Sequence, residues 1–290
     1  MKAYLDIVRK VLEGGVMTPN RTGIDALTIF SPPNFEHDMT EGFPLLTTKK
    51  MAWKSARVEL EGFIHGITDK KWYQDNGCRV WNEWCNPKRI PDGLNEADRK
   101  SYALRERDLG PIYGFQWRHW GAEYQGSEPH YRGEGCDQLA RMVNTLKTDP
   151  YDRGMLVNSW NVLDFDKMAL RPCHFNFQAN VFGKRLDLKW EQRSVDVMVG
   201  LPFNIASYGL LLHLLANETG LEPGRLIGSL GNTHIYENHI ENAKGQLKRE
   251  PLELPHIENY RLKSIFNWNH KQSQILDYQH YDPLEFEIAV

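Results

Sequence analysis

Cysteine is scarce in this chain of 290 residues, which contains only Cys78, Cys85, Cys136 and Cys173. Four scattered cysteines without a C-x-x-C pair are too few for a disulfide framework. Free thiols are the state expected in a reducing compartment. The simplest prediction is therefore a cytoplasmic protein.

Long apolar segments and an excess of positive charge are also missing. The first residues, Met1 to Asp6, lack the apolar run of a signal peptide, and no later stretch is long enough to span a bilayer. The formal net charge of −3 disfavours a general nucleic-acid-binding protein. We therefore expect neither a membrane nor a nucleic acid as partner. A small anionic substrate stays open, because a local cluster of arginines binds phosphate whatever the total charge.

The periodicity of the apolar residues mixes helices with antiparallel strands. Helical spacing predicts helices over 2–13, 53–65, 137–146 and 205–219. Apolar residues alternate over 175–181 and 186–190 around a turn at 182–185, which predicts a β-hairpin. This order favours an α+β fold, in one domain over 1–290. The polar stretch at about 86–108 is predicted to be a surface insertion, because apolar sequence resumes on both sides of it.

A thiol, a guanidinium and a carboxylate stand at fixed offsets around this hairpin. Cys173 follows a proline at its start, while Arg193 and Asp196 lie on the second strand. A cysteine attacks only as its thiolate, and a nearby arginine lowers the pKa that limits it. The alternative for Cys173 is a small buried apolar residue. An arginine is rarely buried without an anion, so Arg193 requires a carboxylate or a ligand phosphate.

Further polar residues each allow two interpretations. Asn204 precedes an apolar helix, so it is either the N-cap or the reader of an amide-like edge. Asp196 is either a satisfied turn residue or an acceptor for a ligand N–H. His234 and Tyr236 would share one side of a strand, where they either bind a sugar hydroxyl or are structural. His234 and His239 would not share a helix face, so we reject a zinc site.

Glu59 lies inside an apolar helical pattern, two residues before Glu61. A carboxylate buried by its helix has a raised pKa and exchanges protons near neutrality. The alternative is that one or both glutamates are solvated. Arg21 lies in a turn and is either a surface residue or a phosphate ligand. Two roles are possible for Trp81, Trp84 and Trp117. They either pack in the core or form a flat platform for an aromatic cofactor.

Several long motifs together resemble the thymidylate synthase family. They are Arg171-Pro-Cys173-His174, Gln192-Arg193-Ser194-Val-Asp196, Gly200-Leu-Pro-Phe-Asn204-Ile-Ala-Ser-Tyr208, Gly231-Asn-Thr-His234-Ile-Tyr236, Asn20-Arg21-Thr22-Gly23, Thr47-Thr-Lys49, Leu109-Gly-Pro-Ile-Tyr113-Gly and Ala289-Val290. The resemblance covers nearly the whole chain apart from the stretch at 86–108. It implies a homodimer of α+β subunits, each with a large, mixed, mainly antiparallel sheet flanked by helices. The sheets of the two subunits would pack back to back.

The resemblance also implies a reaction, the reductive methylation of dUMP to dTMP. The co-substrate 5,10-methylenetetrahydrofolate would supply the carbon and the hydride, without a metal. The catalytic residues implied are Cys173, Glu59, Tyr113, Arg193 and Asn204. Those implied for dUMP are Arg21, Arg153 (donated across the dimer), His174, Gln192, Arg193, Ser194, Asn204, His234 and Tyr236. Those implied for the folate are Lys49, Trp81, Trp84, Asp196, Val199, Gly200, Phe203 and Ala289.

Three positions depart from the family pattern. Arg153-Gly154 stands where two adjacent arginines usually reach the phosphate, and losing one contact would weaken binding by roughly 1.5–3 kcal/mol. Asn176 replaces an aromatic residue, and Glu61-Gly62 replaces an apolar pair. Polar side chains beside the cysteine would favour a related dUMP hydroxymethylase, in which water replaces hydride. A third possibility is a homologue that only binds nucleotides or RNA.

Overall fold

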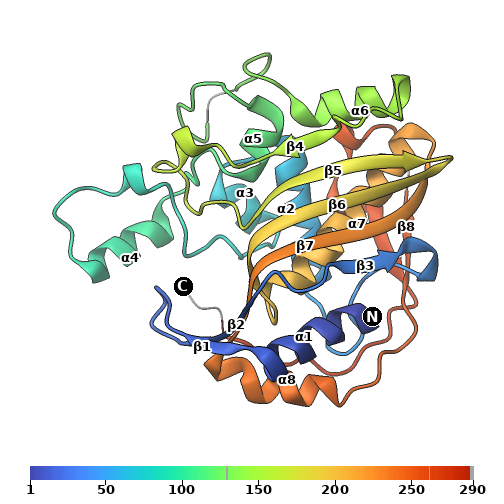
Figure 1. The fold of residues 1–290 in the computed structure, drawn as a ribbon. Helices are drawn as coiled ribbons and strands as arrows, with labels where there is room; N and C mark the ends of the chain where they lie inside the picture. The colour runs from blue at the N-terminus through green and yellow to red at the C-terminus, as the bar shows by residue number, and fades with distance from the viewer. Residues whose placement is uncertain (129, 261, 288–290) are drawn as a thin grey trace.

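A large mixed sheet organises the computed structural model, which describes residues 1–128, 130–260 and 262–287 (Figure 1). The strand order is β1-β2-β7-β6-β5-β4, and β3 also pairs with β7. Only β6 and β7 run parallel, so the prediction of a mainly antiparallel α+β fold is confirmed. The strands of this sheet are β1 (Val16–Thr18), β2 (Ala26–Phe30), β3 (Phe35–Asp38), β4 (Leu156–Asn158), β5 (His174–Phe182), β6 (Arg185–Asp196) and β7 (Glu222–Tyr236). A separate small sheet pairs β8 (His256–Asn259) with β9 (Ser273–Leu276).

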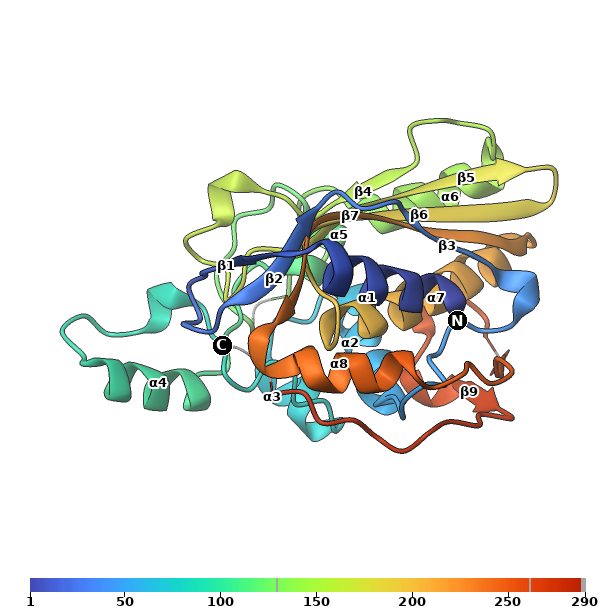
Figure 2. The ribbon, with the colours of Figure 1, turned by 60° about the horizontal axis from the view of Figure 1, so that its bottom comes forward.

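The larger helices gather on one side of the sheet. Figure 2 shows α1, α2, α7 and α8 beneath β5, β6 and β7. The helices are α1 (Lys2–Gly14), α2 (Trp53–His65), α3 (Lys70–Asp75), α4 (Glu96–Arg105), α5 (Tyr113–His119), α6 (Gln138–Thr148), α7 (Gly200–Thr219) and α8 (Ile240–Leu247). Short 3-10 helices are η1 (Met39–Glu41), η2 (Pro87–Arg89), η3 (Val162–Asp164), η4 (Glu237–His239), η5 (Ile265–Asn267) and η6 (His270–Gln272). None of the helices in the described ranges is long and apolar enough to cross a membrane.

The predicted hairpin is formed by β5 and β6. Phe177, Ala179 and Val181 are buried against the helices, while Gln178 between them is exposed. Gly183 has a φ of 63° in the turn, a conformation that glycine adopts without strain. The register between the strands shifts just after His174, where a bulge changes the face to which the following side chains point.

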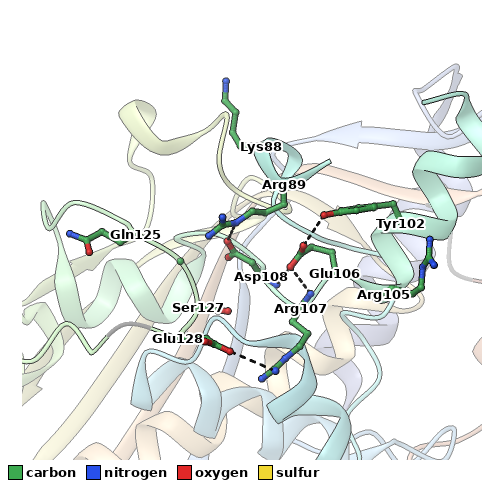
Figure 3. A pocket seen from close by; sticks show the side chains of 11 residues that line it. Lys88, Arg89, Tyr102, Arg105, Glu106, Arg107, Asp108, Gln125, Ser127 and Glu128 are labelled. Carbon is green, nitrogen blue, oxygen red and sulfur yellow. Dashed lines mark hydrogen bonds and ion pairs between the residues drawn. The ribbon is translucent and has the colours of Figure 1, made fainter. Parts of the chain in front are cut away.

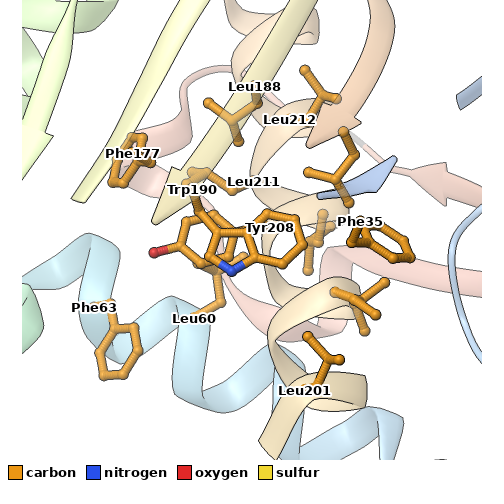
Figure 4. Packing of buried hydrophobic residues seen from close by; sticks show 14 of the residues in the cluster. Phe35, Leu60, Phe63, Phe177, Leu188, Trp190, Leu201, Tyr208, Leu211 and Leu212 are labelled. Atoms are coloured by element: carbon orange, nitrogen blue, oxygen red, sulfur yellow. The ribbon is translucent and has the colours of Figure 1, made fainter. Parts of the chain in front are cut away.

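Helix α7 forms the centre of the core. The Trp190 ring of β6 stacks on the Tyr208 ring of α7 with centroids 5.3 Å apart, and Phe35 packs against the other end of the indole (Figure 4). Leu211 and Leu212 on the same helix are fully buried. A helix that is apolar on nearly every side is stable only where other elements cover it all round, as here.

Helix α7 begins at Gly200, five residues earlier than predicted. The Asp196 side chain accepts hydrogen bonds from the backbone N–H groups of Met198 and Val199, which satisfies donors ahead of the helix. Pro202 is tolerated because the first turn needs no N–H from it. Asn204 therefore lies within the helix, and its interpretation as an N-cap is wrong.

The stretch 86–108 projects from the body as α4 and the short helix η2 (Figure 1). Helix α4 has no buried residue, so this segment lies on the surface. Its two ends are joined by a hydrogen bond from the Asn86 N–H to the Asp108 carbonyl, 2.7 Å long. Whether it is an insertion into the domain stays a prediction.

Helix α2 packs against α3 at a glycine. A Cβ atom on Gly62 would lie 2.3 Å from ring atoms of Tyr73, which is fully buried. The Tyr73 hydroxyl donates a hydrogen bond to the Ile67 carbonyl just after α2, so the ring is held in place. The Gly62 half of the Glu61-Gly62 departure is thus explained by packing.

We expect Gly62→Ala to destabilise the protein by about 1–3 kcal/mol, because the added methyl group overpacks the Tyr73 ring. The free energy of unfolding from urea titration measures this. Gly245→Ala in α8 is the matched control, since nothing lies within 4 Å of a Cβ there. That variant should gain up to about 1 kcal/mol. A Gly62→Ala protein as stable as the wild type would contradict the packing argument.

Candidate active site

Cys173 is fixed through its main chain at the end of β5. Its N–H donates a hydrogen bond to the Tyr113 hydroxyl at 2.8 Å, and its carbonyl accepts one from the Arg193 N–H at 2.8 Å. The residue as a whole is partly exposed. The hairpin thus brings Cys173 and Arg193 side by side, as the sequence predicts.

The electrostatics of the thiol differ from the expectation. Burial raises the pKa of Cys173 above its ordinary value, while the Arg193 and Arg21 guanidinium groups act to lower it. The prediction that arginine stabilises the thiolate has the right sign, but a net lowered pKa is wrong for the protein alone. Desolvation of the thiolate outweighs charges that lie beside the sulfur rather than in contact with it.

Neither Arg21 nor Arg193 has a carboxylate partner among the described residues. The Arg193 side chain donates to the carbonyls of Pro172 and Arg171, both at 2.9 Å, and lies over the Trp160 ring. Arg21 is exposed and lies 5.7 Å from the centroid of the Trp84 ring. Of the two partners expected for Arg193, the carboxylate is missing, which leaves the anionic ligand.

A chain of hydrogen bonds orients Asn204. Its amide nitrogen donates to Gln192 Oε1 at 2.9 Å, which also accepts from the Trp190 indole at 3.2 Å. Gln192 in turn donates to the Ser194 carbonyl at 3.0 Å. The Asn204 amide and the Trp190 indole both donate to Gln192 Oε1. This fixes which way the amide groups of Gln192 and Asn204 face. Gln192 therefore positions Asn204, and Asn204 keeps its carbonyl oxygen and one N–H free.

Glu59 lies at a small cavity with His174 and Asn204. The other residues that line it are Leu60, Phe63, Trp117, Ser207 and Tyr208. Burial raises the pKa of Glu59 to about 7, and the nearby Trp81 indole acts to lower it. This direction agrees with the expectation of a desolvated carboxylate, and its exchange of protons near neutrality stays a prediction.

His174 is held as a neutral ring in this cavity. Burial lowers its pKa to about 3. Its Nδ1 lies 2.9 Å from the Tyr208 hydroxyl, and its ring stacks on Tyr113 with centroids 4.4 Å apart. Sequence reasoning assigned no role to Tyr208. Its position four residues after Asn204 would have placed both on one helix face.

Asp196 and His234 lie side by side in the parallel register of β6 and β7. Asp196 is a satisfied turn residue through one oxygen, which leaves the other available. His234 Nδ1 lies 2.9 Å from the Asn232 side-chain oxygen, and Tyr236 packs edge-on against the His234 ring. The predicted placement of His234 and Tyr236 on one strand is confirmed.

Several of the residues implied for the folate lie at or beside the first turn of α7. Lys49 is buried and donates a hydrogen bond to the Met198 carbonyl, with its ammonium 4.4 Å from the centroid of the Phe286 ring. Burial lowers the pKa of Lys49 to about 8. Val199 and Gly200 begin the helix, and Ala289 lies outside the described residues.

Two of the predicted polar wall residues do not reach this site. Asn176, beyond the bulge, donates to Glu191 at 3.3 Å on the opposite face of the sheet, beside Lys189. Glu61 is buried rather than solvated, and its carboxylate lies 2.6 Å from His270 Nδ1. Residues two apart on a helix point about 200° apart, so Glu61 faces away from Glu59.

The tryptophans divide between core and site rim. Trp117 is core, because it is buried and its indole donates to the Ser159 hydroxyl at 2.8 Å. Trp81 is buried against Phe63 and Tyr113. Trp84 is half-buried, and the Arg21 guanidinium lies over its ring. Over the ranges described, no group of three or more His, Cys, Asp or Glu side chains is arranged to hold a metal ion.

A larger hollow beside the 86–108 segment is lined by none of the predicted site residues (Figure 3). Three of its cations, Lys88, Arg89 and Arg107, are paired with acids, while Arg105 donates to the Ser101 carbonyl. Arg89 lies 2.8 Å from Asp108, and Arg107 lies 3.8 Å from Glu128. Arg21 and Arg193, beside Cys173, have no acidic partner among the described residues, so the region around Cys173 is the better candidate for the active site.

Glu59 makes the stability of the protein depend on pH. Because its pKa in the folded state is about 7 instead of 4.5, folding favours the protonated carboxyl. Its stabilising contribution is complete below pH 4.5 and is lost as the pH rises through 7. Relative to Glu59→Gln, the wild type should lose up to about 3 kcal/mol between about pH 4.5 and pH 8. Urea unfolding at several pH values measures this, and parallel stability curves would contradict it.

Comparisons with known proteins agree with this geometry. Residues 2–290 match the family model described as thymidylate synthase. Thymidylate synthase of Mycoplasma genitalium is 41% identical over 301 residues, covering all of both chains. The human enzyme is 42% identical over 99% of this chain and 90% of its own length, and that of Saccharomyces cerevisiae is 38% identical over 99% and 96%. The chain belongs to the thymidylate synthase family.

Proposed function

We propose that this protein converts dUMP to dTMP with 5,10-methylenetetrahydrofolate and releases dihydrofolate. The observation that carries the proposal is the junction at Cys173. The thiol of partly exposed Cys173 there adjoins two arginines without acidic partners among the described residues. It lies next to a cavity that contains an oriented amide and a carboxyl group of near-neutral pKa. Such a group of side chains suits a nucleotide that carries a phosphate and a ring amide.

Cys173 is the nucleophile of this proposal. Its thiolate adds to carbon 6 of uracil, and the electron pair of the ring double bond makes carbon 5 nucleophilic. Arg193 and Arg21, with Ser194, hold the phosphate and favour the thiolate. Asn204, fixed by Gln192, offers one donor and one acceptor to the uracil amide edge.

The remaining polar groups handle protons and the sugar. Glu59, with a pKa of about 7, both gives and accepts protons near neutrality. Tyr113 accepts a hydrogen bond from the Cys173 N–H, which holds its hydroxyl oxygen beside the nucleophile, where it assists removal of the proton from carbon 5 once the one-carbon unit has been added there. His234 and Tyr236, on one side of β7, bind the deoxyribose hydroxyl. His174 contributes to the dUMP site as a neutral ring.

The residues present fit the folate. Val199 and Phe203 lie four residues apart and so share one side of α7, close to the unused oxygen of Asp196. Trp81 and Trp84 supply flat apolar surface, while Lys49 provides a cation for the glutamate tail. The folate, when bound, supplies the one-carbon unit and the hydride. Closure by Ala289 is part of this proposal.

We further propose that the protein is a homodimer in which Arg153 completes the phosphate site of the other subunit. Within one subunit, the Arg153 carbonyl accepts a hydrogen bond from Gln178 at 3.2 Å. Gln178 lies five residues along β5 from Cys173, or roughly 16 Å, which is beyond the reach of an arginine side chain. The four cysteines are free, which suits the cytoplasm as the site of this reaction.

The hydroxymethylase alternative rests on residues that lie away from the cavity. Asn176 is on the other face of the sheet, and Glu61 pairs with His270. Neither supplies a polar wall beside Cys173, so these two described residues do not favour water over hydride.

The proposal predicts equal amounts of dTMP and dihydrofolate from dUMP and the folate. Cys173→Ser should reduce the turnover number on the order of 10⁴-fold or more, because covalent activation of the ring is lost. Cys136→Ser, at another half-buried cysteine, is the control and should retain activity. Absorbance at the dihydrofolate band and chromatography of the nucleotide give both products. Formation of 5-hydroxymethyl-dUMP without dihydrofolate would identify the hydroxymethylase, and no covalent complex with 5-fluoro-dUMP would exclude either enzyme.

A further inference from the structure

Arg171 has no place among the residues discussed so far, although it lies two residues before the nucleophile. Its carbonyl accepts a hydrogen bond from Arg193 Nη2 at 2.9 Å. The Arg193 side chain is therefore bonded to the main chain of Arg171, close to Cys173. Arg171 itself is exposed.

Two aromatic rings hold both guanidinium groups. The Arg171 guanidinium lies over Phe165, 5.1 Å from the ring centroid, and Arg193 lies over Trp160 at 5.2 Å. Phe165 and Trp160 pack edge to face with centroids 4.6 Å apart. A guanidinium that rests on a ring uses its flat face, so its N–H groups stay available at the edge for a planar or tetrahedral anion.

The charge of this pair is not balanced by the described part of the chain. Neither Arg171 nor Arg193 forms an ion pair with a described carboxylate, whereas Arg185 and Arg225 pair with Asp38 and Asp187. Like charges on adjoining rings repel, and a bound anion between them would turn this repulsion into attraction. A phosphate is the anion that arginines bind most specifically.

We propose that Arg171 is a further ligand of the substrate phosphate, supplied by the same subunit as Arg193. The proposal rests on the phosphate role proposed for Arg193. Arg171 would also compensate for the arginine that is missing at Gly154. Its guanidinium, beside Cys173, would take the place of one that usually comes from the loop of Arg153. The phosphate then depends less on the partner subunit.

The test compares dUMP with deoxyuridine, which differs only by lacking the phosphate. Arg171→Ala should raise the dissociation constant and the KM for dUMP about 10-fold, the size expected for one charge-assisted hydrogen bond. The turnover number should change little, since the phosphate is remote from the reacting carbons. The dissociation constant for deoxyuridine should stay at the wild-type value. Arg171→Lys, which keeps the charge but not the fork of donors, should recover part of the loss.

Lys184→Ala is the matched control, because it removes one positive charge at the hairpin turn, at the opposite end of β5 from Cys173. It should leave the affinity for dUMP unchanged. If Arg171→Ala weakens the binding of dUMP and of deoxyuridine equally, Arg171 has only a structural role. If it does not weaken the binding of dUMP, Arg171 is a surface residue without a role in binding. Either result overturns the proposal. A wild type that binds dUMP no better than deoxyuridine would instead contradict the proposed function itself.

Discussion

The whole site depends on the two main-chain hydrogen bonds of Cys173. One joins it to Tyr113 at the start of α5, and the other joins it to Arg193 on β6. Buried backbone groups need such partners, so the position of the nucleophile is set by the sheet itself. The main chain of Cys173 cannot move relative to that of Arg193 without breaking a hydrogen bond of the hairpin.

Around this fixed point, burial and charge act in opposite directions. Desolvation raises the pKa of both Cys173 and Glu59, and lowers that of His174. The result is a set of neutral groups next to uncompensated arginines. Such a site gains electrostatic stabilisation when an anion binds beside the arginines. A bound anion would also weaken the effect of these arginines on the sulfur, so anion binding and the pKa of the Cys173 thiol are linked.

Sequence reasoning succeeded where one periodic pattern decides the outcome. The hairpin, the helix of Glu59 and the shared side of His234 and Tyr236 follow from spacing alone. It failed where a local irregularity intervenes. A bulge turns Asn176 to the other side of the sheet, and a turn held by the Asp196 side chain lets α7 begin five residues early. Partners distant in the chain, such as His270 for Glu61, leave no trace in local spacing.

The close approach of Tyr73 to Gly62 links two positions that have no direct role in chemistry. The ring occupies the volume that any side chain at position 62 would need. A substitution at 62 therefore becomes acceptable only after position 73 has lost its ring, and a smaller residue at 73 leaves a cavity until 62 is filled. The order in which these two residues can change during divergence is thus constrained by a contact between two helices.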